Sequence, residues 1–169
     1  MVDERAAPTA ISPLTTHHSP FSIEHAGDDE ASFADVYALT VALHLEGGFA
    51  ALDNDKASRA VYQVLQEGLV WVARDESGEA IGTLGLTELS FWYSQDTYLQ
   101  DAWLYVRPDF RGAQVGVALM RAARAEAQAR NKIVLITVTN PDRRPKATAM
   151  SLESQLAGFV PLGYTLKIT

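Results

Sequence analysis

The sequence contains no cysteine, and this absence excludes several kinds of chemistry. A chain without cysteine has no disulfide framework, no thiolate metal ligands and no cysteine nucleophile. No run of about 18 apolar residues occurs, so no segment is expected to span a membrane. The first residues also lack the basic start and the apolar run of a signal peptide. Together these absences favour a cytoplasmic protein.

Positive charge is scarce, with 14 Lys and Arg residues against 21 Asp and Glu residues, for a formal net charge of −7. Broad nucleic-acid binding needs basic surface that neutralises phosphates, so it is not expected here. An acidic surface attracts cationic small molecules or basic peptides instead. His17 and His18 have no acidic or histidine partner at helical spacing, so no metal site is expected.

The 169 residues include 47% hydrophobic residues, which is typical of one soluble globular domain. Residues 1–19 contain Pro8 and Pro13 and few large apolar side chains, which predicts a flexible N-terminal arm. Residues 20–169 show no internal repeat and no linker long enough to divide them. We therefore expect a single domain over residues 20–169.

Hydrophobic periodicity over this domain predicts an alternation of strands and helices. The expected strands are 20–26, 69–75, 80–93, 98–106, 132–138 and one or two within 159–168, and the expected helices are 28–48, 53–67, 114–130 and 146–156. The residues expected to face inward from the third helix are Val115, Ala118, Leu119, Ala122, Ala125 and Ala129. The continuous apolar segment 132–138 predicts a strand buried on both faces. The order of elements indicates an α/β domain.

The segment RPDFRGAQVGVALM, residues 107–120, connects a predicted strand to a predicted helix. The first N–H groups of a helix have no internal partner and carry the positive end of its dipole, so they bind phosphates. The segment lacks the Gly-Lys-Ser/Thr ending of a Walker loop and the G-x-G-x-x-G spacing of a dinucleotide fingerprint. An anion site is one interpretation; an ordinary glycine turn that begins a helix is the other.

This loop resembles the pyrophosphate loop of the GCN5-related N-acetyltransferases (the GNAT family), whose pattern is Arg/Gln-x-x-Gly-x-Gly/Ala. Arg111 matches the first position and Gly116 the last, while Gln114 replaces the central glycine. The stretches LHLEGGFAALDNDKA and FWYSQDTY are similar to the branch often found in bacteriophage and prophage genomes. The resemblance covers roughly residues 20–169.

The resemblance implies a single-domain acyl-CoA N-acyltransferase fold, in the α/β class. In that fold about four helices flank a central, mixed, mostly antiparallel sheet that splays at the cofactor site. It also implies an enzyme that transfers an acetyl group from acetyl-CoA directly to a primary amine on a small molecule or peptide, without a metal. Acetyl-CoA is expected where strand 98–106 separates from strand 133–138.

By this resemblance, the loop amides hold the pyrophosphate and the backbone of Leu104 and Val106 pairs with the pantetheine arm. Amides near Val106 polarise the thioester carbonyl, as in an oxyanion hole. The implied cofactor-binding residues are Leu104, Tyr105, Val106, Arg111, Gly112, Ala113, Gln114, Val115, Gly116 and Asn140.

Gln114 leaves two alternatives open. If the family's glycine is there to adopt a positive φ, glutamine costs roughly 1 kcal/mol or somewhat more in that conformation. If the glycine only lets the phosphate approach closely, the glutamine side chain need only point away. We expect cofactor binding to be retained in either case.

Asp101 and Glu88 are the candidate general bases, because family members often use a carboxylate on the central strands. Either could instead be a solvated carboxylate at a strand end. The usual acid is a tyrosine on the last helix, and AMSLESQLAGF has none there, so Tyr164 is the remaining candidate acid. These departures keep open an alternative function, a catalytically degenerate relative that binds CoA or a protein partner.

Three consecutive aromatic residues, Phe91, Trp92 and Tyr93, end a predicted strand. They could line a substrate pocket or bind a partner. Packing in the core or in a homodimer is the interpretation that we favour.

Overall fold

The structure is a computed structural model that describes residues 20–48, 50–112, 114–137 and 160. Within these ranges, five strands form one sheet in the order β1-β2-β3-β4-β5. The first three pairings are antiparallel, and β4 and β5 are parallel. The strands are β1 Phe21–His25, β2 Val70–Asp75, β3 Ala80–Ser90, β4 Thr97–Val106 and β5 Val134–Leu135. The prediction of a mixed, mostly antiparallel sheet is thus confirmed.

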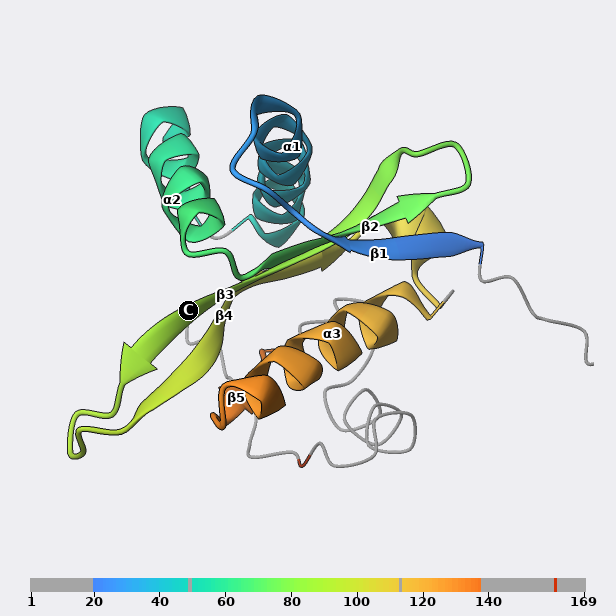
Figure 1. The fold of residues 1–169 in the computed structure, drawn as a ribbon. Coiled ribbons are helices and arrows are strands. Elements are labelled where there is room, and N and C mark those ends of the chain that lie inside the picture. The colour runs from blue at the N-terminus through green and yellow to red at the C-terminus, as the bar shows by residue number, and fades with distance from the viewer. Residues whose placement is uncertain (1–19, 49, 113, 138–159, 161–169) are drawn as a thin grey trace, which may run out of the picture.

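The described residues form three α-helices, α1 Glu30–Gly47, α2 Asn54–Gln66 and α3 Val115–Ala129, and a 3-10 turn at Pro108–Phe110. Figure 1 shows α1 and α2 on one face of the sheet and α3 on the other. The helix predicted at 146–156 and the strands within 159–168 lie outside the described ranges, apart from residue 160.

Two aspartates begin the helices on the first face. Asp29 Oδ1 accepts hydrogen bonds from the N–H groups of Ala31 and Ser32, both at 3.0 Å. Asp53 Oδ1 accepts from Lys56 N–H at 2.9 Å. Each aspartate therefore satisfies helix donors that have no partner within the helix.

The core has two layers, one on each face of the sheet. Between the sheet and α1 and α2 lie residues of α2, β2 and β4 (Val61, Val64, Leu65, Val70, Val72 and Trp103). Between the sheet and α3 lie Ile81, Leu84, Leu86, Leu99, Leu119 and Ala123, among others. Both faces of β2, β3 and β4 are thus covered over much of their length.

The residues that α3 buries agree with the predicted stripe at Val115 and Leu119 and differ from it elsewhere. They are Val115, Val117, Leu119, Met120, Ala123 and Ala127, whereas Ala125 and Ala129 are exposed. The prediction followed the alanines, which are too small to determine which side of the helix faces the sheet. Larger side chains decide it, since Val117 and Met120 pack against Leu104 and Ile136.

Strand β5 is shorter and more open than predicted. Only two of its residues pair with β4, both are half-buried, and Ile133 is 55% exposed. The apolar run at 132–138 therefore does not produce full burial on both faces in the described part of the sheet.

β3 and β4 extend beyond β1 and β2 as an arm, along which β5 pairs with β4 at Leu99 and Gln100. β2 pairs with β3 only as far as Gly85, whereas β3 and β4 stay paired out to Ser90 and Thr97. Figure 1 shows this hairpin projecting past the layer of helices. The strand predicted over 80–93 ends at Ser90, because the chain turns after Phe91, where Ser94 N–H donates to Phe91 O at 3.3 Å.

A buried contact sets the register where the arm joins the sheet. Gly85 lies opposite Trp103, and a Cβ at Gly85 would lie 2.5 Å from the indole ring. Trp103 Nε1 donates to Thr83 Oγ1 at 3.2 Å, and Thr83 Oγ1 donates to Trp71 O at 3.0 Å. The next paired residues are Leu86 and Asp101, so β4 has one extra residue, a β-bulge, at this point.

Candidate active site

The loop between β4 and α3 begins at Arg107, whose N–H donates to Ile81 O at 2.9 Å. The 3-10 turn Pro108–Phe110 follows, and Gly112 then takes a φ of 92°. The chain enters α3 through Gln114, the N-cap, and Val115 is the first helical residue. The predicted sequence of strand, glycine-containing loop and helix is therefore present.

Gln114 has φ 68° and ψ 0°, in the left-handed region. Of the two alternatives for this position, the structure shows the one in which the backbone itself favours glycine. A non-glycine residue in this region costs roughly 1–2 kcal/mol. Gln114 thus keeps a glycine-like backbone at the expense of local strain.

Gly116 lies in the first turn of α3, and the described residues around it do not require a glycine there. Its φ is not in the left-handed range, and a Cβ would come only within 3.7 Å of Val106 Cγ2, an ordinary contact. A residue with a side chain would fit the fold. The open space at this helix start therefore suits the close approach of an anion to first-turn N–H groups that have no partner within the helix.

β4 and β5 separate beside this loop. Their pairing comprises Leu99 with Val134 and Gln100 with Leu135. Further along β4, the Arg107–Ile81 hydrogen bond fixes the alternation of the β3–β4 ladder. By this alternation, the N–H and C=O groups of Leu104 and Val106 point away from β3, toward the side of β5.

Leu104 and Val106 thus direct polar backbone groups to a side on which no strand among the described residues pairs with them, as the pantetheine prediction requires. Tyr105, also predicted to bind the cofactor, pairs with Thr83, and the same alternation directs its backbone at β3. Any role of Tyr105 at the site therefore depends on its ring.

Asp101 lies at the point where the strands part. Its Oδ1 accepts a hydrogen bond from Thr137 N–H at 2.9 Å, which joins β4 to the segment after β5. Burial raises the pKa of this carboxyl group, although the hydrogen bonds from Thr137 oppose the shift. A carboxylate whose pKa is raised by its surroundings is a better proton acceptor than a solvated one.

Glu88, the other candidate base, has a different environment. It pairs with Leu99 on the arm, and its Oε1 contacts Lys132 Nζ at 2.5 Å and accepts from Thr97 Oγ1 at 2.8 Å. These partners, Lys132 first, lower its pKa. Glu88 therefore fits a charge-paired residue of the arm better than a proton acceptor.

Arg111 has a partner that the sequence did not reveal. Its Nη2 donates to Glu46 Oε2 at 2.6 Å, its Nε donates to Val106 O at 3.0 Å, and its guanidinium group lies 5.6 Å from the centre of the Tyr105 ring. The hydrogen bond and charge of Arg111 lower the pKa of Glu46, and so does a hydrogen bond from Tyr105. Burial, followed by the charge of Glu46, raises the pKa of Tyr105. In the sequence, Glu46 only precedes the glycines that end α1.

Several predicted site residues lie outside the described ranges. They are Ala113 in the loop, Asn140 after β5, and Tyr164, the candidate acid. The segment AMSLESQLAGF, where the family's tyrosine is missing, lies there as well. Their assignments stay predictions.

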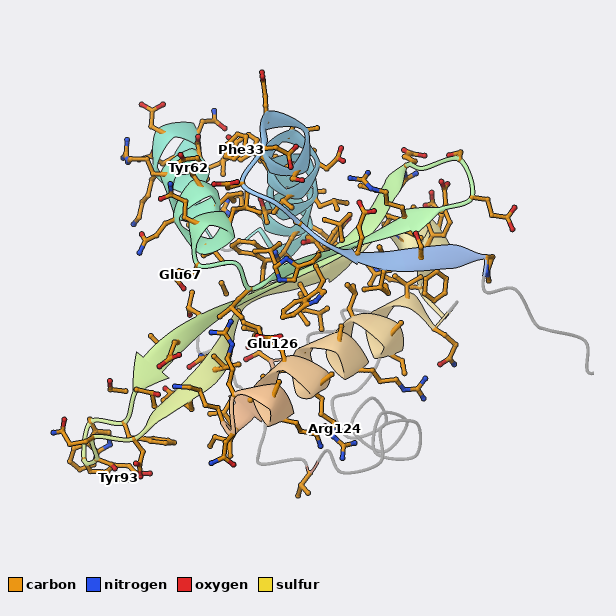
Figure 2. All side chains as sticks on the ribbon, in the orientation of Figure 1. Phe33, Tyr62, Glu67, Tyr93, Arg124 and Glu126 are labelled. Atoms are coloured by element: carbon orange, nitrogen blue, oxygen red, sulfur yellow. The ribbon has the colours of Figure 1, made fainter. Side chains whose placement is uncertain are left out.

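Two open hollows among the described residues lie away from the loop. One, of about 460 Å³, lies between the start of α1 and α2, where Phe33 and Tyr62 face one another with ring centres 6.5 Å apart (Figure 2). The other, of about 320 Å³, is lined by Glu67, Leu69, Glu88 and Arg130. Neither includes the loop residues. We place the candidate site at the loop because aligned backbone donors, rather than an enclosed volume, recognise a phosphate.

The aromatic residues after β3 form a cluster at the tip of the arm, where Figure 2 labels Tyr93. The Phe91 ring stacks on Tyr93 and Tyr98, at 5.3 and 4.5 Å between ring centres. Trp92 is 93% exposed and Tyr93 is 68% exposed. Packing into this chain's own core is therefore wrong for Trp92 and Tyr93, while packing in a homodimer stays a prediction.

No group of three or more histidine, aspartate or glutamate side chains that could hold a metal ion occurs in the described ranges. Among the helices that the structure describes, none has both the length and the apolar character needed to cross a membrane.

Comparison with known proteins supports the family that the sequence of the loop resembles. The family model for the acetyltransferase (GNAT) domain matches residues 66–151, just over half of the chain. A search of curated proteins gives no match.

Solved structures of acetyltransferases have the same fold. A predicted acetyltransferase with acetyl-CoA from Clostridium acetobutylicum is 15% identical, with a TM-score of 0.65, over 88% of this chain and 96% of that one. A GCN5-related N-acetyltransferase from Ralstonia eutropha JMP134 is 21% identical, with a TM-score of 0.64, over 88% and 98%. An aminoglycoside acetyltransferase in complex with sisomicin, from an uncultured soil metagenomic sample, is 21% identical, with a TM-score of 0.60, over 88% and 97%.

Proposed function

This chain belongs to the acetyltransferase (GNAT) domain family, and from that premise we propose that it transfers an acetyl group from acetyl-CoA directly to a primary amine. The observation that carries the proposal is the opening between β4 and β5, with the loop and the start of α3 beside it. There the outward backbone of Leu104 and Val106, the room at Gly116 and the carboxylate of Asp101 lie along one stretch of chain.

We assign the binding roles as follows. The N–H groups from Gly112 to Gly116 bind the pyrophosphate, and those of Leu104 and Val106 align the pantetheine arm and polarise the thioester carbonyl. When bound, acetyl-CoA supplies an acetyl thioester, whose thiolate is a stable leaving group near neutral pH. The open space at Gly116 supports this placement, since the fold tolerates a side chain that the phosphate would exclude.

Asp101 is the proposed general base, directly or through one water. An amine attacks only after losing a proton, and Thr137 N–H holds the Asp101 carboxylate at the opening. The raised pKa of Asp101 and the Lys132 pairing of Glu88 favour Asp101 of the two carboxylates. Tyr164 stays the proposed acid on sequence grounds alone.

For the acceptor we propose a small-molecule or peptide amine that is cationic in solution. The formal net charge of −7 favours the approach of cations. The fold neighbour in complex with sisomicin is consistent with a small-molecule acceptor. We also propose a cytoplasmic location, since a cysteine-free chain suits a reducing compartment, and membership of the phage and prophage branch, on the stretches LHLEGGFAALDNDKA and FWYSQDTY.

A second candidate function is CoA binding without turnover. Gln114 in place of the family's central glycine and the missing tyrosine in AMSLESQLAGF favour it, because both depart from the family's pattern. Turnover with a panel of amines separates the two functions, since both require cofactor binding.

The experiment that tests the proposal is calorimetric titration of the protein with acetyl-CoA, with CoA and ATP alongside. We expect micromolar binding of acetyl-CoA. Gly116→Asp places a carboxylate against the pyrophosphate and should weaken binding on the order of tenfold or more, with thermal stability retained.

The matched control is Ala125→Asp, which adds the same charge to an exposed position of the same helix. It should leave acetyl-CoA affinity unchanged. No binding by the wild-type protein at millimolar cofactor would contradict the proposal, and equal affinity of wild type and Gly116→Asp would contradict the placement of the site.

A further inference from the structure

We infer that Glu46, on the last turn of α1, is a positioning residue that holds the pyrophosphate loop in its binding conformation. The inference rests on the proposed function of that loop. Glu46 is 65 residues before Arg111 in the sequence, yet the two side chains meet at 2.6 Å between Oε2 and Nη2.

Arg111 connects the two ends of the turn that precedes Gly112. Its Nε donates to the carbonyl oxygen of Val106, the last residue of β4, at 3.0 Å. The side chain therefore closes residues 106–111 into a compact turn. Because the chain passes from Arg111 through Gly112 to the start of α3, the position of Arg111 determines where the following N–H groups point.

Glu46 fixes Arg111 from outside this turn. The guanidinium group is held between the Glu46 carboxylate and the face of the Tyr105 ring, 5.6 Å from its centre. Both charged side chains are 29% exposed, so solvent and salt screen this pair less than a fully exposed pair. Two different elements, α1 and β4, thus restrain one arginine, and its conformational freedom falls accordingly.

If Glu46 instead competed with the cofactor for Arg111, the expected effect of removing it would be the reverse. A carboxylate that competed with pyrophosphate for Arg111 would weaken cofactor binding, and its removal would tighten binding. The hydrogen bond to Val106 O and the contact with Tyr105 favour positioning, because they hold Arg111 against its own turn at the same time as Glu46 does.

The test compares Glu46→Gln with Glu76→Gln, which removes the same charge from an exposed position in the β2–β3 turn. Calorimetry with acetyl-CoA should give a dissociation constant about fivefold higher for Glu46→Gln, as for the loss of a half-buried ion pair, and an unchanged value for Glu76→Gln. In steady-state assays the KM for acetyl-CoA should rise, while kcat stays unchanged. An unchanged or a lower dissociation constant for Glu46→Gln would overturn the inference.

Two further measurements separate positioning from general stability. If Glu46 acts through Arg111, adding Glu46→Gln to Arg111→Gln should weaken binding no further, whereas additive losses would contradict that route. Amide hydrogen exchange of residues 107–117, without cofactor, should be faster in Glu46→Gln and unchanged in Glu76→Gln. If the wild-type protein failed to bind acetyl-CoA, the proposed function would fall, and the exchange result alone would decide whether Glu46 holds the loop.

Discussion

Two residues at this site differ in what their positions require: one has a strained backbone, and the other has space for a side chain that it lacks. Gln114 keeps a backbone conformation that favours glycine, whereas Gly116, two residues later, has room for a side chain. The two positions therefore respond in opposite ways to the presence of a Cβ. At Gln114 the strain is internal to the protein, and at Gly116 the proposed reason for glycine is the ligand.

Replacing Gln114 with glycine should raise the free energy of unfolding by about 1 kcal/mol, because the left-handed backbone costs glycine nothing. Urea unfolding measures this difference. The control is Gln128→Gly, the same change at an exposed position in the last turn of α3, which should lower stability by up to roughly 0.5–1 kcal/mol. A decrease in both variants would mean that the Gln114 backbone is not strained.

The Asp101→Asn variant should lose activity without losing stability. Asparagine can still accept the hydrogen bond from Thr137 N–H, but it cannot take a proton from the amine. We expect kcat to fall by on the order of 10²–10⁴. Because burial raises the pKa of Asp101, its ionised form is disfavoured in the folded protein, and stability at neutral pH should stay equal or increase.

Steady-state kinetics with the best amine found, together with urea unfolding, checks this prediction. Glu88→Gln is the comparison, and its effect on kcat should stay below tenfold, since Lys132 already occupies that carboxylate. A large loss in Glu88→Gln with none in Asp101→Asn would reverse the assignment of the base.

Among the elements, the β3–β4 pair positions the site. The sequence pattern predicted its two strands but not the details of their pairing. Both strands were expected, although β3 ends at Ser90 rather than residue 93, and the bulge at Ala102 is not visible in the pattern of apolar residues. The bulge arises where Gly85 and Trp103 meet, and this contact depends on which residues lie opposite one another across the two strands. Cross-strand register is a tertiary property, since it is determined jointly by two segments of chain.

Gly85→Ala should destabilise the protein by roughly 1–3 kcal/mol, because the new methyl group would lie 2.5 Å from the Trp103 ring and displace it. The hydrogen bond from Trp103 to Thr83 would weaken as well. Urea unfolding tests this expectation, and a change in near-ultraviolet circular dichroism would report the movement of the ring.

Gly116→Ala provides the control for stability, since a methyl group fits there and alanine favours a helix by roughly 0.5–1 kcal/mol. Opposite signs are therefore expected for the two glycine-to-alanine changes. Equal stability of Gly85→Ala and wild type would show that Trp103 can move without cost.

At the scale of the whole molecule, negative charge dominates, and most of the perturbed carboxyl groups are stabilised in their ionised form. The pKa values of Asp29, Glu46, Asp75 and Glu88 are all lowered, by hydrogen bonds to helix or turn donors or by basic partners. Asp101 is the described carboxyl group whose pKa is raised. The free energy of unfolding therefore depends on pH through two opposing contributions, one from the carboxyl groups with lowered pKa values and one from Asp101.

We expect the free energy of unfolding to decrease as the pH falls through the carboxyl range. A group with a lowered folded-state pKa stabilises the fold fully above its unfolded pKa, near 4. That contribution is lost as the pH drops through the folded value. Asp101 works in the opposite direction, because protonation relieves its burial, so Asp101→Asn should show the steeper loss of stability in acid.

Urea midpoints measured between neutral pH and about pH 3 provide the check. Salt should reduce the part of the effect that depends on surface ion pairs. A midpoint that stays constant or rises toward low pH would contradict the shared direction of the four lowered pKa values.

The sequence by itself determined the local elements, the class of fold and the family. Hydrophobic periodicity, capping aspartates and turn glycines act over a few residues, and the Arg111-to-Gly116 pattern is contiguous, so all of these are visible along the chain. Only the tertiary structure decided the strain at Gln114, the contrast between Asp101 and Glu88, the bulge opposite Gly85 and the Glu46–Arg111 pair. Each of these depends on burial, register or contact between distant segments, and such quantities exist only once the chain is packed.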